Sequence, residues 1–210
     1  MSRSGTARSA TMQRDPAGLA ARFFEVIAAD IVPLTRAGVA AGNKVFGAAI
    51  LRKDDLSLVL AGTNAETENP LFHGEIATLN AFYRLAPSAR PATAECLFLS
   101  THEPCPLRLS AIAWAGFDNF TYLFPYEATR DAFAIPHDLR MLEEVFGVKD
   151  GRYRPANAYW TSGSIADLVS AAPAAERAAL EGRIEALGGA YADLSATYQA
   201  RKGDTAIPLS

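Results

Sequence analysis

The sequence predicts an α/β protein, a three-layer α/β/α sandwich with a mixed central sheet. Two observations predict this class: a helical segment precedes a short hairpin, and helices and strands then alternate along the chain. Elements in this order form a sheet with helices on both faces. A length of 210 residues with half of them apolar is enough for one domain with a full core.

The first third of the chain is predicted to form a helix and a hairpin. Ala17–Ala40 carries apolar residues at helical spacing, and Pro33 is expected to kink or end this helix. Val45–Leu51 and Leu56–Ala61 are apolar runs typical of strands, separated by a short charged turn. Such a turn between two strands predicts a hairpin.

Helices and strands alternate in the middle of the chain. His73–Leu85 has apolar residues three apart and is predicted to be a helix with one packed face. Glu95–Ser100 is typical of a buried strand, and a helix is expected to begin near Cys105 and run to Ala115. Phe120–Phe124 completes a set of four predicted strands.

The C-terminal third is predicted to be helical, over Ala128–Ala134, Pro136–Phe146, Ser164–Ser170 and from Pro173 onward. Its last helix carries a continuous apolar seam of six residues. These are Leu180, Ile184, Leu187, Tyr191, Leu194 and Tyr198. The seam has two interpretations, packing on the parent domain or a contact between subunits, and the first is favoured.

This organisation divides the chain into a disordered tail over residues 1–16, a main domain over 17–160 and a helical extension over 161–210 packed on it. The charge is nearly balanced, with 20 basic and 23 acidic residues, and shows no basic cluster of the kind that binds nucleic acid. No apolar stretch approaches the ~20 residues that span a bilayer. The two cysteines are too few for a disulfide framework, so a cytoplasmic location is expected.

Two short motifs carry the chemistry. His73-Gly74-Glu75 stands at the start of one predicted helix, and Pro104-Cys105 stands at the start of another, after a strand. The zinc deaminases have H-x-E followed by P-C-x-x-C: a histidine and two cysteines hold zinc, and the glutamate transfers protons. Zinc lowers the pKa of its bound water to about 7, and that water then attacks the ring.

The resemblance extends beyond the two motifs. Phe46-Gly47-Ala48 resembles the P-F-G-A segment of the cytidine/deoxycytidylate deaminase superfamily, and Asn64 stands where members place a substrate-contacting asparagine. The stretch from Glu103 to Trp114 is similar to the E-P-C-P-M-C-x-x-A-I-x-W of guanine deaminases and tRNA adenosine deaminases. The resemblance therefore implies the cytidine-deaminase-like fold.

The resemblance also implies roles for individual residues. His73 and Cys105 are expected to bind zinc, and Glu75 is expected to be the catalytic proton shuttle. The expected substrate-binding residues are Phe46, Asn64, Glu103 and Arg108. The implied substrate is a nucleobase or nucleoside, and the implied assembly is a homodimer. Neither a membrane nor a nucleic acid is an expected partner.

Arg108 departs from the motif because it stands where the second cysteine ligand belongs. A guanidinium is permanently cationic and cannot bind zinc. We therefore consider a salt bridge from Arg108 to Glu75 or to the Cys105 thiolate, and also a pocket in which Arg108 binds an anionic or purine-like ligand. His102 is a weaker candidate for a replacement zinc ligand.

Two functions follow. One is a hydrolytic deaminase impaired by the missing ligand, and the other is a metal-free pseudo-deaminase that binds a ligand or regulates a partner subunit. From the C-terminal region, the pair His137-Asp138 and the carboxylates of Glu143 and Glu144 are within possible reach of the site. A solvated helix face is the favoured interpretation for these carboxylates.

Overall fold

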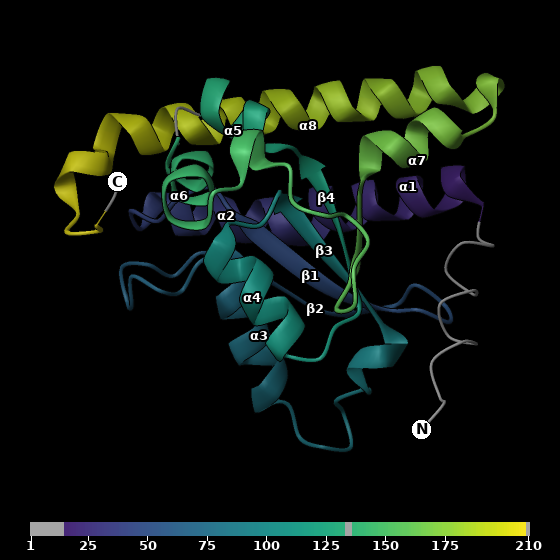
Figure 1. Ribbon diagram of the computed structural model, residues 1–210. Coiled ribbons are helices and arrows are strands. Elements are labelled where there is room, and N and C mark those ends of the chain that lie inside the picture. The colour runs from purple at the N-terminus through teal and green to yellow at the C-terminus, as the bar shows by residue number, and fades with distance from the viewer. Residues whose placement is uncertain (1–14, 133–135, 209–210) are drawn as a thin grey trace.

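A mixed five-stranded sheet lies between two helical layers (Figure 1). The computed structural model describes residues 15–132 and 136–208. The sheet has the order β2-β1-β3-β4-β5. Its strands are β1 (Gly47–Arg52), β2 (Leu58–Thr63), β3 (Cys96–His102), β4 (Asn119–Phe124) and β5 (Thr161–Ser164).

The strands run in both directions, which confirms the predicted mixed sheet. β1 is antiparallel to β2 and to β3, whereas β3, β4 and β5 are parallel. The four predicted strands are present. The fifth, β5, lies at the start of the segment expected to be a helical extension and pairs with β4 at the edge of the sheet. It was missed because Thr161–Ser164 contains no apolar residue.

Alternate residues of β1 point to opposite faces of the sheet. Ala48 and Ile50 face α3 (Gly74–Arg84) and α4 (Pro106–Trp114) in one core cluster. Ala49 and Leu51 face the other cluster. That cluster is covered by α1 (Pro16–Val26), α2 (Val32–Ala40), α7 (Ile165–Ala171) and α8 (Ala174–Arg201). Two further helices, α5 (Tyr126–Asp131) and α6 (His137–Phe146), follow β4.

The N-terminal helix passes through Pro33 instead of ending there. A π-helical turn, η3 (Ile27–Ile31), lies directly before α2, and Pro33 is in the first turn of α2. Proline has no N–H to donate, and a widened turn before it lets the helix continue without that bond. Most of the expected N-terminal tail lies outside the described residues, but Asp15 caps α1 by accepting from Ala17 and Gly18.

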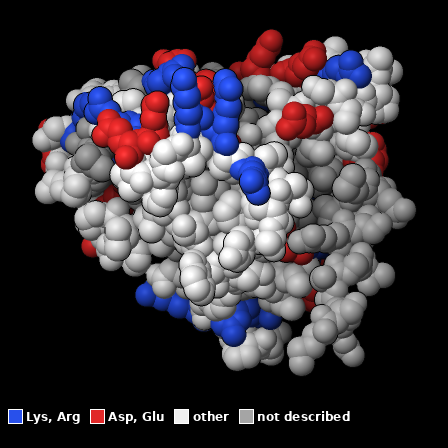
Figure 2. Space-filling model, in the orientation of Figure 1, with Lys and Arg blue, Asp and Glu red and all other residues white. Residues whose placement is uncertain are grey.

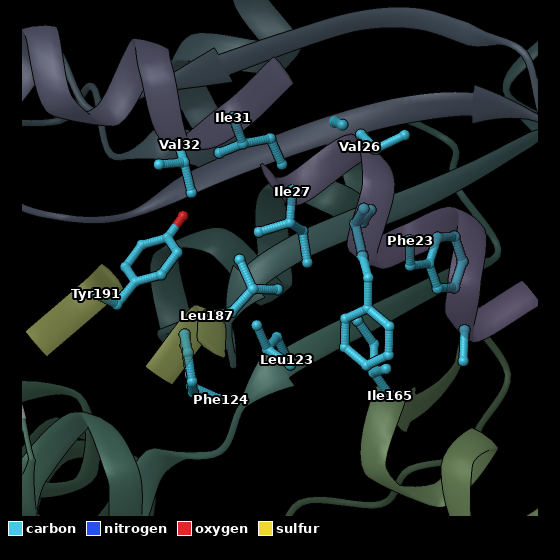
Figure 3. Close-up of a cluster of buried hydrophobic side chains, with 14 of the residues drawn as sticks. Phe23, Val26, Ile27, Ile31, Val32, Leu123, Phe124, Ile165, Leu187 and Tyr191 are labelled. Atoms are coloured by element: carbon cyan, nitrogen blue, oxygen red, sulfur yellow. The ribbon is translucent and has the colours of Figure 1, made fainter. Parts of the chain in front are cut away.

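The apolar seam of α8 packs on its own domain. Figure 3 shows Leu187 and Tyr191 of α8 directed toward Ile27 and Val32 of the N-terminal helices. The remaining buried seam residues are Leu180, Leu194 and Tyr198. This confirms the favoured interpretation, and these side chains are not available to a partner subunit.

Short 3-10 turns lie at Thr93–Glu95, Lys149–Gly151 and Lys202–Asp204. Within the described part of the chain, no helix is both long and apolar enough to cross a membrane.

Candidate functional site

The sheet brings two helix N-termini together. His73 is the N-cap residue of α3, and Cys105 is the N-cap residue of α4, which follows β3. The Cys105 Sγ lies 3.6 Å from the His73 Nδ1. The two predicted ligand residues, distant in sequence, are therefore neighbours in the fold.

Gly74 allows α3 to begin against the backbone of β1. A Cβ atom at this position would lie 2.7 Å from the Phe46 carbonyl oxygen and 2.9 Å from backbone atoms of Gly47. Real Cβ atoms do not approach backbone so closely, so the contact requires glycine. Glu75, the next residue of α3, is fully buried.

Arg108 occupies the centre of the site and is fully buried. Its Nη1 donates to both carboxylate oxygens of Glu75, each at 3.2 Å, which confirms the salt bridge considered from the sequence. Its Nη2 donates to the Asp138 Oδ2 at 2.5 Å. The guanidinium carbon lies 4.7 Å from the centre of the Phe46 ring, within the range of a cation–π contact.

The Glu75 carboxylate is held by donors from the protein. Ser100, on β3, donates its hydroxyl to the Glu75 Oε1 at 2.5 Å, in addition to the two contacts from Arg108. Burial raises the pKa of Glu75, and the Arg108 charge and the Ser100 hydrogen bond act in the opposite direction. The residue expected to transfer protons is thus fixed by a permanent cation.

The two ligand-type side chains are electrically neutral in this setting. Burial, followed by the charges of Arg108 and Lys44, lowers the pKa of His73 to about 3. Burial raises the pKa of the Cys105 thiol, with Arg108 acting against it. Both pKa shifts favour the uncharged ring and the uncharged thiol.

A second charged cluster adjoins His73. The Glu66 carboxylate accepts from Lys44 Nζ at 3.0 Å and from the Asn64 side-chain amide at 2.5 Å, and its Oε1 lies 3.5 Å from His73 Nε2. All but His73 are buried. The Asn64 Oδ1 is a buried acceptor without a hydrogen-bond partner. Lys44 and Glu66 were missed, since nothing in their spacing distinguishes them from solvated charges.

The Glu103 carboxylate forms its hydrogen bonds within the protein. One carboxylate oxygen accepts from the Tyr126 backbone N–H at 3.1 Å and the other from the Tyr153 hydroxyl at 2.8 Å. Both oxygens are thereby used to attach α5 and the following segment to the end of β3.

Asp138 is the one C-terminal carboxylate among those considered that enters the site. It projects from the first turn of α6 to Arg108, whereas Glu143 and Glu144 on the same helix are exposed.

These residues do not fit zinc. Catalytic zinc is held by three protein ligands and a water. No group of three His, Cys, Asp or Glu side chains suited to a metal is found among residues 15–132 and 136–208. His102, considered as a replacement, is buried with its Nδ1 3.0 Å from the Thr101 hydroxyl and its ring packed on Tyr191 of α8.

The solved structures that resemble this one are deaminases. A guanine deaminase from Nitrosomonas europaea is 20% identical, with a TM-score of 0.49 over 90% of this chain and 94% of that one. A variant of NE0047 in complex with 8-azaguanine is 20% identical, with a TM-score of 0.50 over 95% of this chain and 94% of that one. A guanine deaminase from Bacillus subtilis is 28% identical over 48% of this chain and 64% of that one, with a TM-score of 0.39.

The class of protein follows from the architecture. The five-stranded mixed sheet and its flanking helices match over nearly the whole chain, so the fold is the cytidine-deaminase-like fold predicted from the sequence. No profile of a known protein family matches the chain, and no curated protein matches its sequence.

Proposed function

We propose that this chain is a metal-free pseudo-deaminase, which binds a nucleobase-like ring in a deaminase-type site without hydrolysing it. One observation carries the proposal: Arg108, which stands in the sequence where the zinc-deaminase motif has its second cysteine, is fully buried and forms an ion pair with Glu75. The guanidinium supplies a fixed positive charge where zinc deaminases hold their metal.

The same ion pair removes the base that hydrolysis needs. A general base must reach the proton that it abstracts. Both oxygens of Glu75 accept from Arg108, and one also accepts from Ser100. A carboxylate held this way is neither free to take a proton nor placed beside a metal-bound water.

The site retains polar groups able to orient a ring. Asn64 keeps a buried carbonyl oxygen without a partner, and its amide is fixed by Glu66. A buried acceptor without a partner is unfavourable, and a ring N–H or amino group would satisfy it. The ring class is proposed in view of the similarly folded NE0047, which has been crystallised with 8-azaguanine and 2,6-diaminopurine.

A nucleic-acid ligand is not part of the proposal. On the face shown in Figure 2, Lys and Arg side chains lie in separate groups, among Asp and Glu side chains at the upper edge and apart at the lower edge, and a broad uncharged area separates the groups. A tRNA-binding surface normally presents such an area.

Elemental analysis of zinc tests the proposal. The native chain is expected to contain no zinc, and Arg108→Cys is expected to hold about one per chain, since it completes the His-Cys-Cys set. Arg108→Gln is the matched control, because it removes the charge without adding a ligand. Stoichiometric zinc in the native protein would overturn the proposal.

A second candidate is a hydrolytic deaminase of a nucleobase, acting through zinc. One observation favours it: the 3.6 Å between Cys105 Sγ and His73 Nδ1 suits two ligands of one tetrahedral ion. Ammonia release from a panel of bases and nucleosides decides between the two candidates. Release by the native chain that is lost in Glu75→Gln would favour the hydrolase.

A further inference from the structure

Arg108 binds two carboxylates of unequal burial. Glu75 comes from α3 and has a fully buried side chain, whereas the Asp138 side chain comes from α6 and is 13% exposed. Glu75 is also held by Ser100, but the hydrogen bond from Arg108 is the contact that holds the Asp138 carboxylate in the site. Asp138 is therefore the partner of Arg108 that is nearer to solvent and less firmly held.

The helix that carries Asp138 makes few other buried contacts. Of the ten residues of α6 only Leu142 is buried, and Met141, Val145 and Phe146 are exposed. A helix is normally held by a stripe of buried apolar residues, and α6 has one such residue. The ion pair between Asp138 and Arg108 is thus a main attachment of α6 to the site.

The two clusters around the site also contain more carboxylates than cations. Among the described residues, the two adjoining clusters contain the cations Lys44 and Arg108 and three carboxylates. Glu66 pairs with Lys44, whereas Glu75 and Asp138 share Arg108, so three carboxylates are paired with two cations. Burial raises the pKa of Asp138, and the charges of Arg108 and Lys44 act in the opposite direction.

We propose that Asp138 occupies, in the free protein, a carboxylate-binding position on Arg108, and that the ligand is a ring bearing a carboxylate that displaces Asp138 and releases α6. The exchange keeps the charge around Arg108 constant, since one carboxylate replaces another. It returns Asp138 to water. This inference rests on the proposed function, because it assigns the ligand class of the same site.

Calorimetric titration with cytosine and 5-carboxycytosine tests the proposal. The two rings differ only in the carboxylate. In the native chain the competing Asp138 reduces the apparent affinity for 5-carboxycytosine, so Asp138→Asn is expected to bind it at least about tenfold more tightly. Any change in cytosine affinity should be much smaller, whereas the Glu144→Gln variant should bind both rings as the native chain does. Glu144→Gln is the matched control, since Glu144 lies on the same helix in an exposed pair with Arg140.

Hydrogen exchange of the native chain gives an independent measurement. Saturating 5-carboxycytosine is expected to speed amide exchange in α6, and cytosine is not. Binding of 5-carboxycytosine without faster exchange in α6, or equal affinity in the native chain and Asp138→Asn, would overturn the proposal. Binding of cytosine alone, or of neither ring, would overturn it, whereas the zinc content of the native chain tests the proposed function separately.

Discussion

Arg108 Nη1 lies 3.2 Å from each carboxylate oxygen of Glu75, and neither side chain is exposed to solvent. Glu75 lies in the first turn of α3 and Arg108 in the first turn of α4. Desolvating both charges is unfavourable, and the pair offsets this only while both partners are present. Loss of either side chain alone is therefore expected to destabilise the folded chain.

The first prediction concerns this dependence. Arg108→Met should destabilise the chain by about 3–5 kcal/mol, because it leaves Glu75 as an uncompensated buried charge. Combining it with Glu75→Gln should recover a large part of that loss. Urea denaturation of the native chain, both single variants and the double variant gives the coupling free energy. Losses that simply add would mean that the two side chains do not interact.

The second prediction concerns acid pH. The pKa of His73 is lowered to about 3 by burial and by the charges of Arg108 and Lys44, so the folded chain keeps this ring neutral at pH 5. The unfolded chain protonates the ring below about pH 6.5. Because the unfolded state binds more protons, stability falls as the pH falls below that value.

His73→Gln should remove this contribution. Between pH 7 and pH 5 the native chain is expected to lose about 1–2 kcal/mol more than the variant, allowing for partial exposure of His73. Urea midpoints at both pH values measure the difference, and the NMR titration of the imidazole reports its pKa directly. A His73 ring that titrates near pH 6.5 in the folded chain would contradict the prediction.

How much of the site the sequence predicts depends on the range of the contacts. His73, Glu75, Cys105 and Arg108 were singled out because they belong to, or depart from, two short sequence motifs, and the structure brings these motifs together at the starts of α3 and α4. The pairing of Arg108 with Glu75 was one of several alternatives, since the sequence does not define which side chains share a buried space.

Contacts made by the tertiary fold alone were not predictable in this way. Lys44 pairs with Glu66 across 22 positions, and Asp138 reaches Arg108 across 30 positions. A charged residue is far more often solvated than buried, so a single sequence gives no reason to pair these. The pKa of the Cys105 thiol was not predictable from the sequence either, because it depends on burial, which is a property of the folded chain.

The third prediction concerns the close approach of α3 to β1. Gly74→Ala should destabilise the chain by more than 1 kcal/mol, because the added Cβ would meet backbone atoms of Phe46 and Gly47 at 2.7 to 2.9 Å. It should also displace Glu75 from Arg108. Gly188→Ala is the control: its Cβ meets nothing within 4 Å, and alanine in a helix should add about 0.4–1 kcal/mol. Equal effects of the two substitutions would refute this account.

The last prediction separates a core contact from a subunit contact. Leu187 of α8 is 7% exposed and packs in the cluster that joins α1, α8 and the sheet (Figure 3). Leu187→Ala should cost about 2–5 kcal/mol, as for other buried leucines, whereas Leu71→Ala, at a position 58% exposed, should change stability by less than about 0.5 kcal/mol.

Protein concentration provides the decisive comparison for this variant. If the seam is an internal contact, as its packing indicates, the loss at Leu187 should be the same in dilute and concentrated protein. A contact between subunits would instead make the unfolding midpoint rise with concentration, because association stabilises the folded state by mass action. A homodimer, which remains a prediction, must therefore use a surface other than the α8 seam. The variant should lower stability without changing the mass measured in solution.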